Sequence, residues 1–488
     1  MAKKNIDNQH QSKYSHSEKE NRVSKIQVLP NNWKTIKVKD AIVNLSISGK
    51  KLMKKNYKNC GIFPVIDQGQ EFIGGYCNDK SKVISCIESL IVFGDHTRIF
   101  KFVNFDFVPG ADGVKLLQPT KAYYPKLLYY FLKVVQFPNK GYARHFQYLL
   151  KCELPLPPLN EQKRIVAKIE ELFSKLDAGA ESLKKVKAQL KRYRQSVLKA
   201  AFEGKLTEKW REKHKERESS IRKQMNFSKK EKVSNQEYAP SRLKKIPISW
   251  TWATIGDIKE SMKNGIYKPK KFYSDDGIPC LRMYNIEDGK IVWKNIKRMV
   301  LSEQELKDYG LLAGDILINR VNSRELVGKS AVIPDGLGHC VYESKNIRLR
   351  VKKKVSLSKY VNYWLLLEAR NFFNRNAQQT VGMASINQEQ ISLMPIPLTS
   401  LKEQQKIIEE IERRFSIIDS LEKTIDNSLK EAERLRQAIL KKAFEGRLVP
   451  QDPNDEPAWK LLERIKEEKK RLEAEKKNKK KRTKKGRC

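Results

Sequence analysis

Apolar residues recur at steps of four and three from position 165 onward, which is the pattern of one face of a long helix. The series is sustained over several heptads, and Gly179 is its one miss. A helix of about 40 residues would be about 60 Å long. The segment ends in AFEG, where Gly204 suits a left-handed cap. The apolar positions of this predicted helix are Ile165, Ile169, Leu172, Leu176, Leu183, Val186, Leu190, Tyr193 and Val197.

The same pattern returns near the end of the chain. EQKRIVAKIEELFSKLDAGAESL starts at Glu161, EQQKIIEEIERRFSIIDSLEKTI starts at Glu403, and the two copies align without a gap through AFEGKL and AFEGRL. Apolar positions of the second copy are Ile407, Ile411, Ile418, Leu421, Ile425, Leu435 and Ile439, with Arg414 and Ser428 weakening the seam. A narrow apolar stripe on one helix is buried best by a matching stripe on another helix. We therefore expect the two helices to pair as an antiparallel coiled coil. Pairing is assigned to Ile165, Ile169, Leu172, Leu176 and Leu190, and to Ile407, Ile411, Ile418, Ile425 and Ile439.

The segments between the copies are repeated more loosely. LPNNW and IPISW open the two variable segments, and LPLP and MPIP close them. The first segment has strand-like runs and Gly-rich turns at 63–76 and 87–102, followed by a helical run at 123–135. The second segment has such runs at 277–286 and 313–333, followed by a helical run at 358–373. We therefore predict an α+β protein with two similar mixed α/β domains, two long paired helices and pseudo-twofold symmetry.

The predicted organisation has seven parts. These are a polar leader (1–25), a first domain (26–157), a central repeat helix (158–213), a basic linker (214–245), a second domain (246–397), a second repeat helix (398–448) and a C-terminal segment with a basic tail (449–488).

Composition indicates the partner of the two domains. Lys and Arg number 99 against 57 acidic residues, a net charge of +42, which is typical of a protein that binds a polyanion. The run KKNKKKRTKKGR in the tail favours a solvated segment over a specific site. The sequence has no apolar run of membrane-spanning length and no signal-peptide pattern, and its seven cysteines form no close pair, so we expect a cytoplasmic protein without disulfides or a zinc site.

Polar and basic residues of the predicted loops are the candidates for DNA contact, because planar and cationic groups bind base edges and phosphates. In the first domain they are Arg98, Arg144, His145 and Gln147. In the second they are Arg282, Asn285, Arg320, Asn322, Arg324 and Lys329. The aromatic residues of the two domain helices are interpreted as core.

Catalytic signatures are weak. The sequence has no N/D-P-P-Y/F tetrad and no Gly-rich loop for S-adenosylmethionine, and the LVGKS run lacks the first Gly of a phosphate loop because Ser323 stands there. Asp335, Glu343 and Lys345 match a degenerate PD and ExK nuclease spacing. We predict that the chain carries out no chemistry itself and binds no metal. A restriction endonuclease and an architectural DNA-binding protein without sequence preference remain the alternatives.

The order of parts carries a family resemblance. PLPPLNEQKRIVAKIEELF, PIPLTSLKEQQKIIEEIERRF, the two AFEG ends, LVPQDPNDEPAWKLLERI, and the phrases FGDHTRIFKF, GYARHF and AGDILINRVNS are similar to the specificity subunit of type I restriction-modification systems. The resemblance covers nearly all of residues 25–465. The polar leader and the basic tail depart from the family pattern.

The resemblance implies a function and a set of partners. In that family, each recognition domain reads one half of a bipartite, asymmetric double-stranded DNA site, and the helices set the gap. The subunit binds two methyltransferase subunits, which hold S-adenosylmethionine, and two motor-nuclease subunits, which use ATP and Mg²⁺; the chain itself would hold no cofactor. The duplicated helices suggest two equivalent docking faces, for which we predict Glu161, Arg164, Glu403 and Lys406 on the outward surface. The alternative is that these charges belong to solvated faces only.

Overall fold

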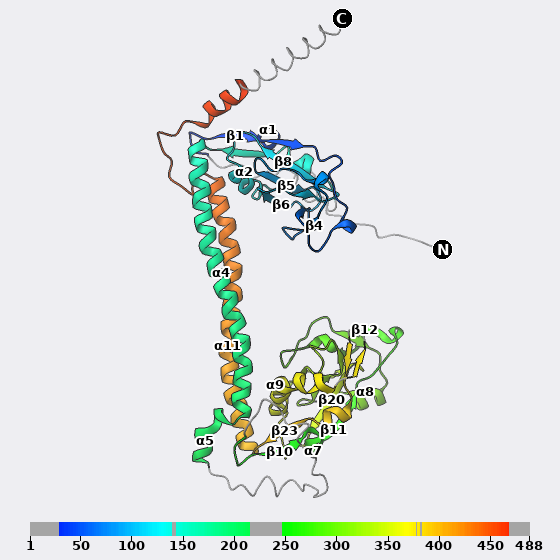
Figure 1. The fold of residues 1–488 in the computed structure, drawn as a ribbon. Coiled ribbons are helices and arrows are strands. Elements are labelled where there is room, and N and C mark those ends of the chain that lie inside the picture. Colours follow the sequence, from blue (N-terminus) through cyan, green and yellow to red (C-terminus); the bar gives the residue numbers. More distant parts are fainter. Residues whose placement is uncertain (1–28, 139–142, 215–245, 377, 381–382, 468–488) are drawn as a thin grey trace, which may run out of the picture. The chain divides into compact units, whose positions relative to one another are not determined.

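The computed structural model describes residues 29–138, 143–214, 246–376, 378–380 and 383–467 (Figure 1). The predicted polar leader, nearly all of the basic linker and the basic tail lie outside the described residues. The chain divides into two compact units. The first holds residues up to 182 and from 427 onward, and the second holds residues 183–426. The fold class predicted from the sequence is confirmed, since each unit holds one mixed α/β domain and half of each long helix.

The two long helices are α4 (Leu159–Phe202) and α11 (Leu401–Phe444), and they lie side by side in Figure 1. In the second unit, Lys187 pairs with Asp426 and Arg194 pairs with Glu422. Because the partner number falls as the number along α4 rises, the helices are antiparallel. Gly204 and Gly446 follow the helices with φ of 74° and 70°, so the predicted left-handed caps are present.

In the middle of the two helices, the buried positions differ from the seam that the sequence predicts. Ile407, Ile411, Ile418 and Ile425 are buried, whereas Val186, Tyr193, Leu421 and Leu435 are exposed. The partly buried positions beside them carry charged side chains, Lys187 and Arg194 in α4 and Glu422 and Arg436 in α11. A strict seven-residue pattern drifts by about 20° per heptad on a straight helix, so apolar positions extrapolated over several heptads rotate out of the interface. The long stems of Lys and Arg can cover apolar surface while their charged ends pair at its rim.

The first domain contains three small sheets. A four-stranded sheet has the order β2-β8-β5-β6, a three-stranded sheet the order β4-β3-β7, and β1 pairs with β9. Two short helices, α2 and α3, follow the last strand of the large sheet. The elements are β1 (Lys34–Lys37), α1 (Val38–Ala41), β2 (Ile42–Leu45), β3 (Phe63–Ile66), β4 (Gly75–Cys77), β5 (Leu90–Gly94), β6 (Phe100–Val103), β7 (Val108–Pro109), β8 (Val114–Pro119), α2 (Pro125–Leu132), α3 (Phe146–Leu149) and β9 (Glu153–Leu156).

The second domain repeats this topology. Its sheets have the orders β11-β20-β16-β18 and β15-β12-β19, and β10 pairs with β23. The pairs β3·β7 and β12·β19 are both parallel, whereas the neighbouring pairs are antiparallel. The elements are β10 (Thr251–Thr254), α7 (Ile255–Ile258), β11 (Lys259–Asn264), β12 (Tyr273–Leu281), β15 (Lys297–Met299), α8 (Glu303–Tyr309), β16 (Ile316–Asn319), β18 (Ser330–Val332), β19 (Val341–Tyr342), β20 (Asn346–Val351), α9 (Ser358–Asn376), α10 (Gln388–Ser392) and β23 (Pro395–Leu398).

Two small sheets are additional in this domain. They are β13 (Ile286–Glu287) with β14 (Lys290–Ile291), and β17 (Val321–Asn322) with β22 (Met383–Ser385) and β21 (Gln378–Thr380). The predicted helical runs correspond to α2 and α9, and the predicted strand regions contain β3 to β6, β12 and β16 to β18.

Each domain core is completed by the end of a long helix. In the first unit, Phe444 of α11 lies 5.3 Å, centroid to centroid, from Phe131 of α2. In the second unit, Phe202 of α4 lies 5.0 Å from both Tyr360 and Trp364 of α9. The AFEG phenylalanines are therefore core residues of the domains. Among the described residues, none of the helices has the length and apolar character of a membrane span.

Core packing predicts a contrast between two isoleucines of α11. Ile411 is fully buried, while Ile417 is 53% exposed. Ile411→Ala should lower the free energy of unfolding by about 2–5 kcal/mol, because it removes buried methyl groups and leaves a cavity. Ile417→Ala should change it by less than about 0.5 kcal/mol. Urea unfolding of the full chain, followed by circular dichroism, measures both free energies. Equal losses for the two variants would contradict the assignment of Ile411 to the core and Ile417 to the surface.

Candidate DNA-recognition loops

In the first domain, Asp95 joins two of the predicted contact segments. Its backbone carbonyl accepts hydrogen bonds from the His145 backbone N–H and ring Nδ1, both at 2.9 Å, and its carboxylate accepts one from the Phe146 N–H at 2.7 Å. These bonds hold the turn that carries Arg98 against the segment that carries Arg144 and Gln147. The three side chains Arg98, Arg144 and Gln147 are exposed, whereas His145 is buried.

A second loop of this domain, residues 67–74, lies close to the same turn. Asp67 Oδ1 accepts a hydrogen bond from the Gly69 N–H at 2.8 Å and lies 3.5 Å from Lys101 Nζ. Burial lowers the pKa of Lys101, and Asp67 opposes that effect. Gln68 Oε1 accepts from the His96 N–H at 3.3 Å, which links this loop to the turn 95–98. The pair of Asp67 and Lys101 could not be predicted from the sequence, because a loop residue and a strand residue 34 positions apart form it.

In the second domain, two predicted contact residues are engaged inside the domain. Arg282 Nε donates to Glu343 Oε2 at 2.8 Å, and Glu343 Oε1 accepts from the Met283 N–H at 3.0 Å. Asn285 is fully buried and donates to the carbonyls of Val292 and Lys294. These bonds shape the loop after β12, so Asn285 is a scaffold residue rather than a surface group.

The other four predicted residues lie on or next to the segment between β16 and β18. Arg320 donates to the carbonyls of Ile386 and Ser344 at 3.4 Å, and buried Asn322 donates to Asn319 Oδ1 at 2.8 Å. Arg324 is exposed. Burial lowers the pKa of partly buried Lys329. Of the ten predicted contact residues, His145, Asn285 and Asn322 are therefore buried in the folded domains, and contact by the others remains a prediction.

The nuclease-like spacing does not assemble a carboxylate site. Glu343 is buried, and both its oxygens accept hydrogen bonds from Arg282 and the Met283 backbone. Asp335 stands in an exposed turn. Among the described residues, no group of three or more His, Cys, Asp and Glu side chains is placed to hold a metal ion.

The start of each long helix forms a buried junction with its domain. In the first unit, Trp33 Nε1 donates to Glu161 Oε2 at 2.9 Å, and Gln451 Nε2 donates to Glu161 Oε1 at 2.6 Å. Burial raises the pKa of Glu161, and the bonds from Trp33 and Gln451 oppose that rise. Arg164 forms a two-bond ion pair with Asp455, at 2.6 and 3.2 Å.

The second unit has an equivalent junction with a different closing residue. Trp250 Nε1 donates to Glu403 Oε2 at 2.9 Å, and Arg211 Nη1 lies 2.5 Å from Glu403 Oε1. Thr399 and Thr207 also donate to this carboxylate. The expectation that Glu161 and Glu403 lie on outward faces is wrong, because each is buried against the indole of its own domain. Lys406 stays at the surface beside Glu409 and Glu410, and the partner-binding role of all four residues remains a prediction.

The residues next to these glutamates secure the same junctions. Gln162 and Gln404 are fully buried, and each donates to two backbone carbonyls and accepts from one backbone N–H of its domain. A Cβ on Gly204 would lie 2.3 Å from Pro247 Cγ, and a Cβ on Gly446 would lie 2.5 Å from Pro30 Cγ. The AFEG glycines therefore serve both as helix caps and as contact points for the proline that opens each domain.

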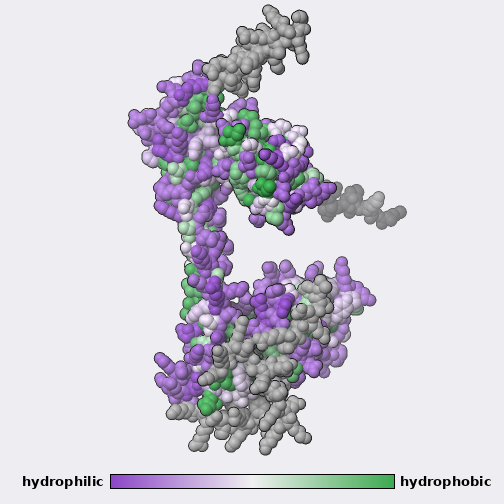
Figure 2. Space-filling model, in the orientation of Figure 1, coloured by the Kyte–Doolittle hydropathy of each residue, from purple (hydrophilic) through white to green (hydrophobic). Residues whose placement is uncertain are grey.

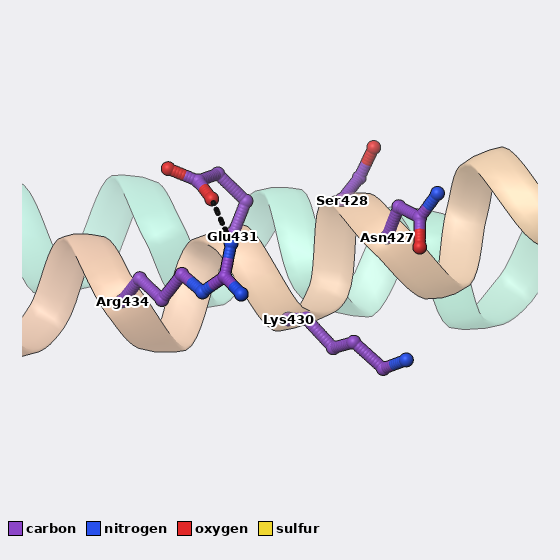
Figure 3. A pocket seen from close by; sticks show the side chains of 5 residues that line it. All are labelled: Asn427, Ser428, Lys430, Glu431 and Arg434. Carbon is purple, nitrogen blue, oxygen red and sulfur yellow. Dashed lines mark hydrogen bonds and ion pairs between the residues drawn. The ribbon is translucent and has the colours of Figure 1, made fainter.

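Figure 3 shows a surface hollow on α11. It has a volume of about 430 Å³ and is lined by Asn427, Ser428, Lys430, Glu431 and Arg434. Arg434 donates to Glu431 at 3.4 Å, and every lining side chain is polar. The hollow lies on one exposed helix face and has the character of a solvated surface.

The fold defines a protein of two topologically equivalent mixed α/β domains, each followed by one helix of an antiparallel pair. The chain belongs to the family described as type I restriction modification DNA specificity domain, which matches residues 30–192 and 247–431. The resemblance inferred from the motifs is thereby confirmed.

Characterised relatives are specificity subunits of type I restriction enzymes. The EcoKI subunit of Escherichia coli (strain K12) is 32% identical over 328 residues, which cover 64% of this chain and 63% of that protein. The StySPI subunit of Salmonella potsdam is 30% identical with the same coverage. The EcoDI subunit of Escherichia coli is 24% identical over 461 residues, covering 90% of this chain and 96% of that protein. The matches thus span less than two thirds of the EcoKI and StySPI subunits.

A solved structure has the same fold. It comes from a study of complex assembly and conformational transition of the type I R-M system, and it is 18% identical, with a TM-score of 0.60, over 86% of this chain and 100% of that chain. At this identity the likeness shows the fold alone.

The junction geometry predicts unequal effects of two matched substitutions. In both, the new amide NH₂ would face a hydrogen-bond donor. Glu403→Gln also leaves Arg211 without its buried countercharge, so it should lower the free energy of unfolding by about 3–5 kcal/mol. Glu161→Gln, whose bonded partners are neutral, should lower it by about 1–3 kcal/mol. Urea unfolding measures both, with exposed Glu409→Gln as the control. A larger loss for Glu161→Gln would refute this account.

Proposed function

We propose that this chain is the DNA-specificity subunit of a type I restriction-modification complex. Each domain reads one half of a bipartite, asymmetric double-stranded DNA site, and the helix pair sets the length of the gap. The chain supplies recognition and carries no catalytic group. S-adenosylmethionine belongs to the methyltransferase subunits, and ATP and Mg²⁺ belong to the motor-nuclease subunits.

The observation that carries this proposal is that the two domains share the orders of their three main sheets but differ in their loops. Both domains have the same sheet orders, and both are closed by the same Trp–Glu junction. The loops that follow the equivalent strands β3 and β12 differ in length, sequence and charge. Conserved scaffolds with divergent loops are the expected design for two readers of different half-sites. The net charge of +42 supplies the attraction for the DNA backbone that any such reader requires.

Replacing residues 30–154 with the corresponding segment of a relative should change one half-site only. The segment contains β1 and ends inside β9, whose last two residues, Pro155 and Leu156, stay those of this chain. The exchanged domain meets the same Glu161 and Gln162. Methylome sequencing of cells expressing the wild-type and hybrid chains, with cells lacking the gene as the baseline, reads both half-sites. A change in both halves would refute independent reading.

Docking of methyltransferase subunits is the second part of the proposal. The second unit carries an apolar strip, formed by Val186, Tyr193, Ile417 and Leu421, which are 43%, 45%, 53% and 47% exposed. Arg414 Nη1 lies 3.5 Å from Tyr193 Oη, which places Tyr193 on the Arg414 side of the helix pair. Leu421 follows Arg414 by two helical turns, so it lies on that side as well.

The recognition domain of this unit lies on another side of the same helix. Its Lys359 and Lys290 pair with Glu412 and Asp419 of α11, positions about 200° around the helix from Arg414 and Leu421. Figure 2 shows apolar surface along the paired helices. The strip is therefore accessible to a partner while the domain is in place. An amphipathic helix fits a narrow apolar strip of this kind.

The copy of the strip in the first unit is more polar. The repeat aligns Val186, Tyr193, Ile417 and Leu421 with Ser428, Leu435, Lys175 and Gly179. Ser428 lines the polar hollow of Figure 3. We propose two docking faces of unequal strength, with the face of the second unit the stronger.

Charge introduced into the strip should remove one partner. Leu421→Glu should reduce the complex from two methyltransferase subunits per chain to one, because a carboxylate would be buried against an apolar partner surface. Ser416→Glu adds the same charge at an exposed position of α11 about 140° around the helix, and should leave two partners bound. Native mass spectrometry of the co-expressed proteins counts them. Two partners on the Leu421→Glu chain would exclude the strip as a docking face.

A further inference from the structure

A Lys-Lys-x-Tyr turn occurs at the same place in both domains. In the first domain, Lys54–Asn56 form a 3-10 turn that ends at Tyr57; in the second, Lys270–Phe272 form one that ends at Tyr273. The first turn connects β2 to β3, and the second connects β11 to β12, which are equivalent strands in the two sheet orders.

The backbone before each turn is fixed in the same way. Leu52 forms a parallel bridge with Gly110, and Ile266 forms one with Glu343. Gly110 follows β7 and Glu343 follows β19, the equivalent parallel partners of β3 and β12. Leu52 and Ile266 are both buried. Each turn is therefore held at the same edge of its domain by the core.

The tyrosine that ends each turn faces inward. Tyr57 Oη donates to Asp67 Oδ2 at 3.3 Å, and burial raises the pKa of Tyr57 well above its usual range. Tyr273 packs against the small core of its domain, which includes Ile266 and Met299, and burial likewise raises its pKa. With the tyrosine anchored inside, the two lysines of each turn are directed to the surface.

The lysines of the turns have no carboxylate partner among the described residues. Nearby Lys268 is 13% exposed and pairs with Glu305 at 2.6 Å, and Lys50 donates to the Val83 carbonyl at 2.7 Å. Lys54, Lys55, Lys270 and Lys271 are exposed, and no carboxylate of the described residues lies within 4.0 Å of their ammonium groups. Two adjacent cations without counterions raise the local positive potential, and here the pair recurs at the same core-fixed position in both domains.

We propose that these two turns are phosphate clamps, each holding the DNA backbone beside the half-site that its domain reads. The proposal rests on the proposed function and on the logic of the repeat. Two domains that read different sequences can share only those contacts that carry no sequence information, and contacts to phosphate are of that kind. A Lys-Lys pair on a turn fixed by the core supplies such contacts at the same position in both readers. Tyr57 and Tyr273 are positioning residues, since they hold the turn and leave the phosphates to the lysines.

The test measures the affinity of the full chain for two duplexes over a series of salt concentrations. One duplex contains the bipartite site identified by methylome sequencing, and the other has both half-sites scrambled. Each phosphate contact contributes about 0.9 to the slope of log K against log salt. Lys54→Ala/Lys55→Ala and Lys270→Ala/Lys271→Ala should each reduce that slope by about 1.8, and should weaken both duplexes by the same factor.

Two further variants separate this outcome from misfolding and from general loss of charge. Lys54→Arg/Lys55→Arg keeps both charges and should restore the slope. Lys353→Ala/Lys354→Ala removes an exposed lysine pair from a turn after β20 and should leave the slope unchanged.

The outcomes that overturn the proposal are distinct from failure of the proposed function. An unchanged slope in the Lys54/Lys55 and Lys270/Lys271 variants, or a loss confined to the cognate duplex, would overturn the clamps. A wild-type chain that binds both duplexes equally would instead refute sequence-specific recognition, and the slopes would still decide whether the clamps exist.

Discussion

A buried carboxylate at the start of each long helix is the constraint on which the rest of the structure depends. Glu161 and Glu403 each accept a hydrogen bond from the indole of the tryptophan that opens the domain. A carboxylate removed from water is stable only where hydrogen-bond donors replace the lost water, and here each oxygen of both carboxylates accepts at least one hydrogen bond, which restricts the geometry of these contacts. The strand that begins each domain is thereby fixed to the helix that follows it. Gln162 and Gln404 then bind both the segment before the domain helix and the last connection of the domain to the same helical turn.

The two junctions reach this geometry with different chemistry. Glu403 is neutralised by Arg211, which follows the AFEG end of α4 by a few residues. Among the residues that the structure describes, no cation pairs with Glu161, whose second oxygen accepts from Gln451 instead. Arg164 pairs with Asp455 one helical turn away. Arg211 and Gln451 both come from the chain segment just after an AFEG end. Both lie beside the AFEG glycine, which contacts the proline that opens the domain. The repeat therefore preserves the position of the closing segment but not its charge, which makes the second junction the more strongly ionic.

The two long helices and the order of the domains could be predicted from the sequence, because both follow from patterns that repeat along the chain. Seven-residue spacing in α4 and α11, the gapless repeat and the Pro-bounded ends of the variable segments each depend on local pattern alone. The failures have physical causes. Glu161 and Glu403 are charged residues in the first turn of a helix, so a solvent-exposed position is expected from the sequence. Their burial depends on tryptophans that lie 128 and 153 positions earlier in the chain. Asn285 and Asn322 resemble contact residues because loop-shaping amides and base-reading amides have the same chemistry. The Lys-Lys-x-Tyr turns escape notice because the variable segments align by strand order and not by residue identity.

The base of the equivalent loops shows how the two domains diverge without losing their scaffold. Asp67 follows β3 and Arg282 follows β12, at the same place in the two parallel pairs. Asp67 lies beside buried Lys101, whereas Arg282 pairs with buried Glu343. The charge at the equivalent position is reversed, yet each group meets an opposite charge supplied from another strand. Since a buried charge is acceptable in either sign once it is paired, the loops above this position can change sign and sequence while the sheets below stay the same. Under the proposed function, two domains with the same main sheets would in this way present different surfaces to the two halves of a DNA site.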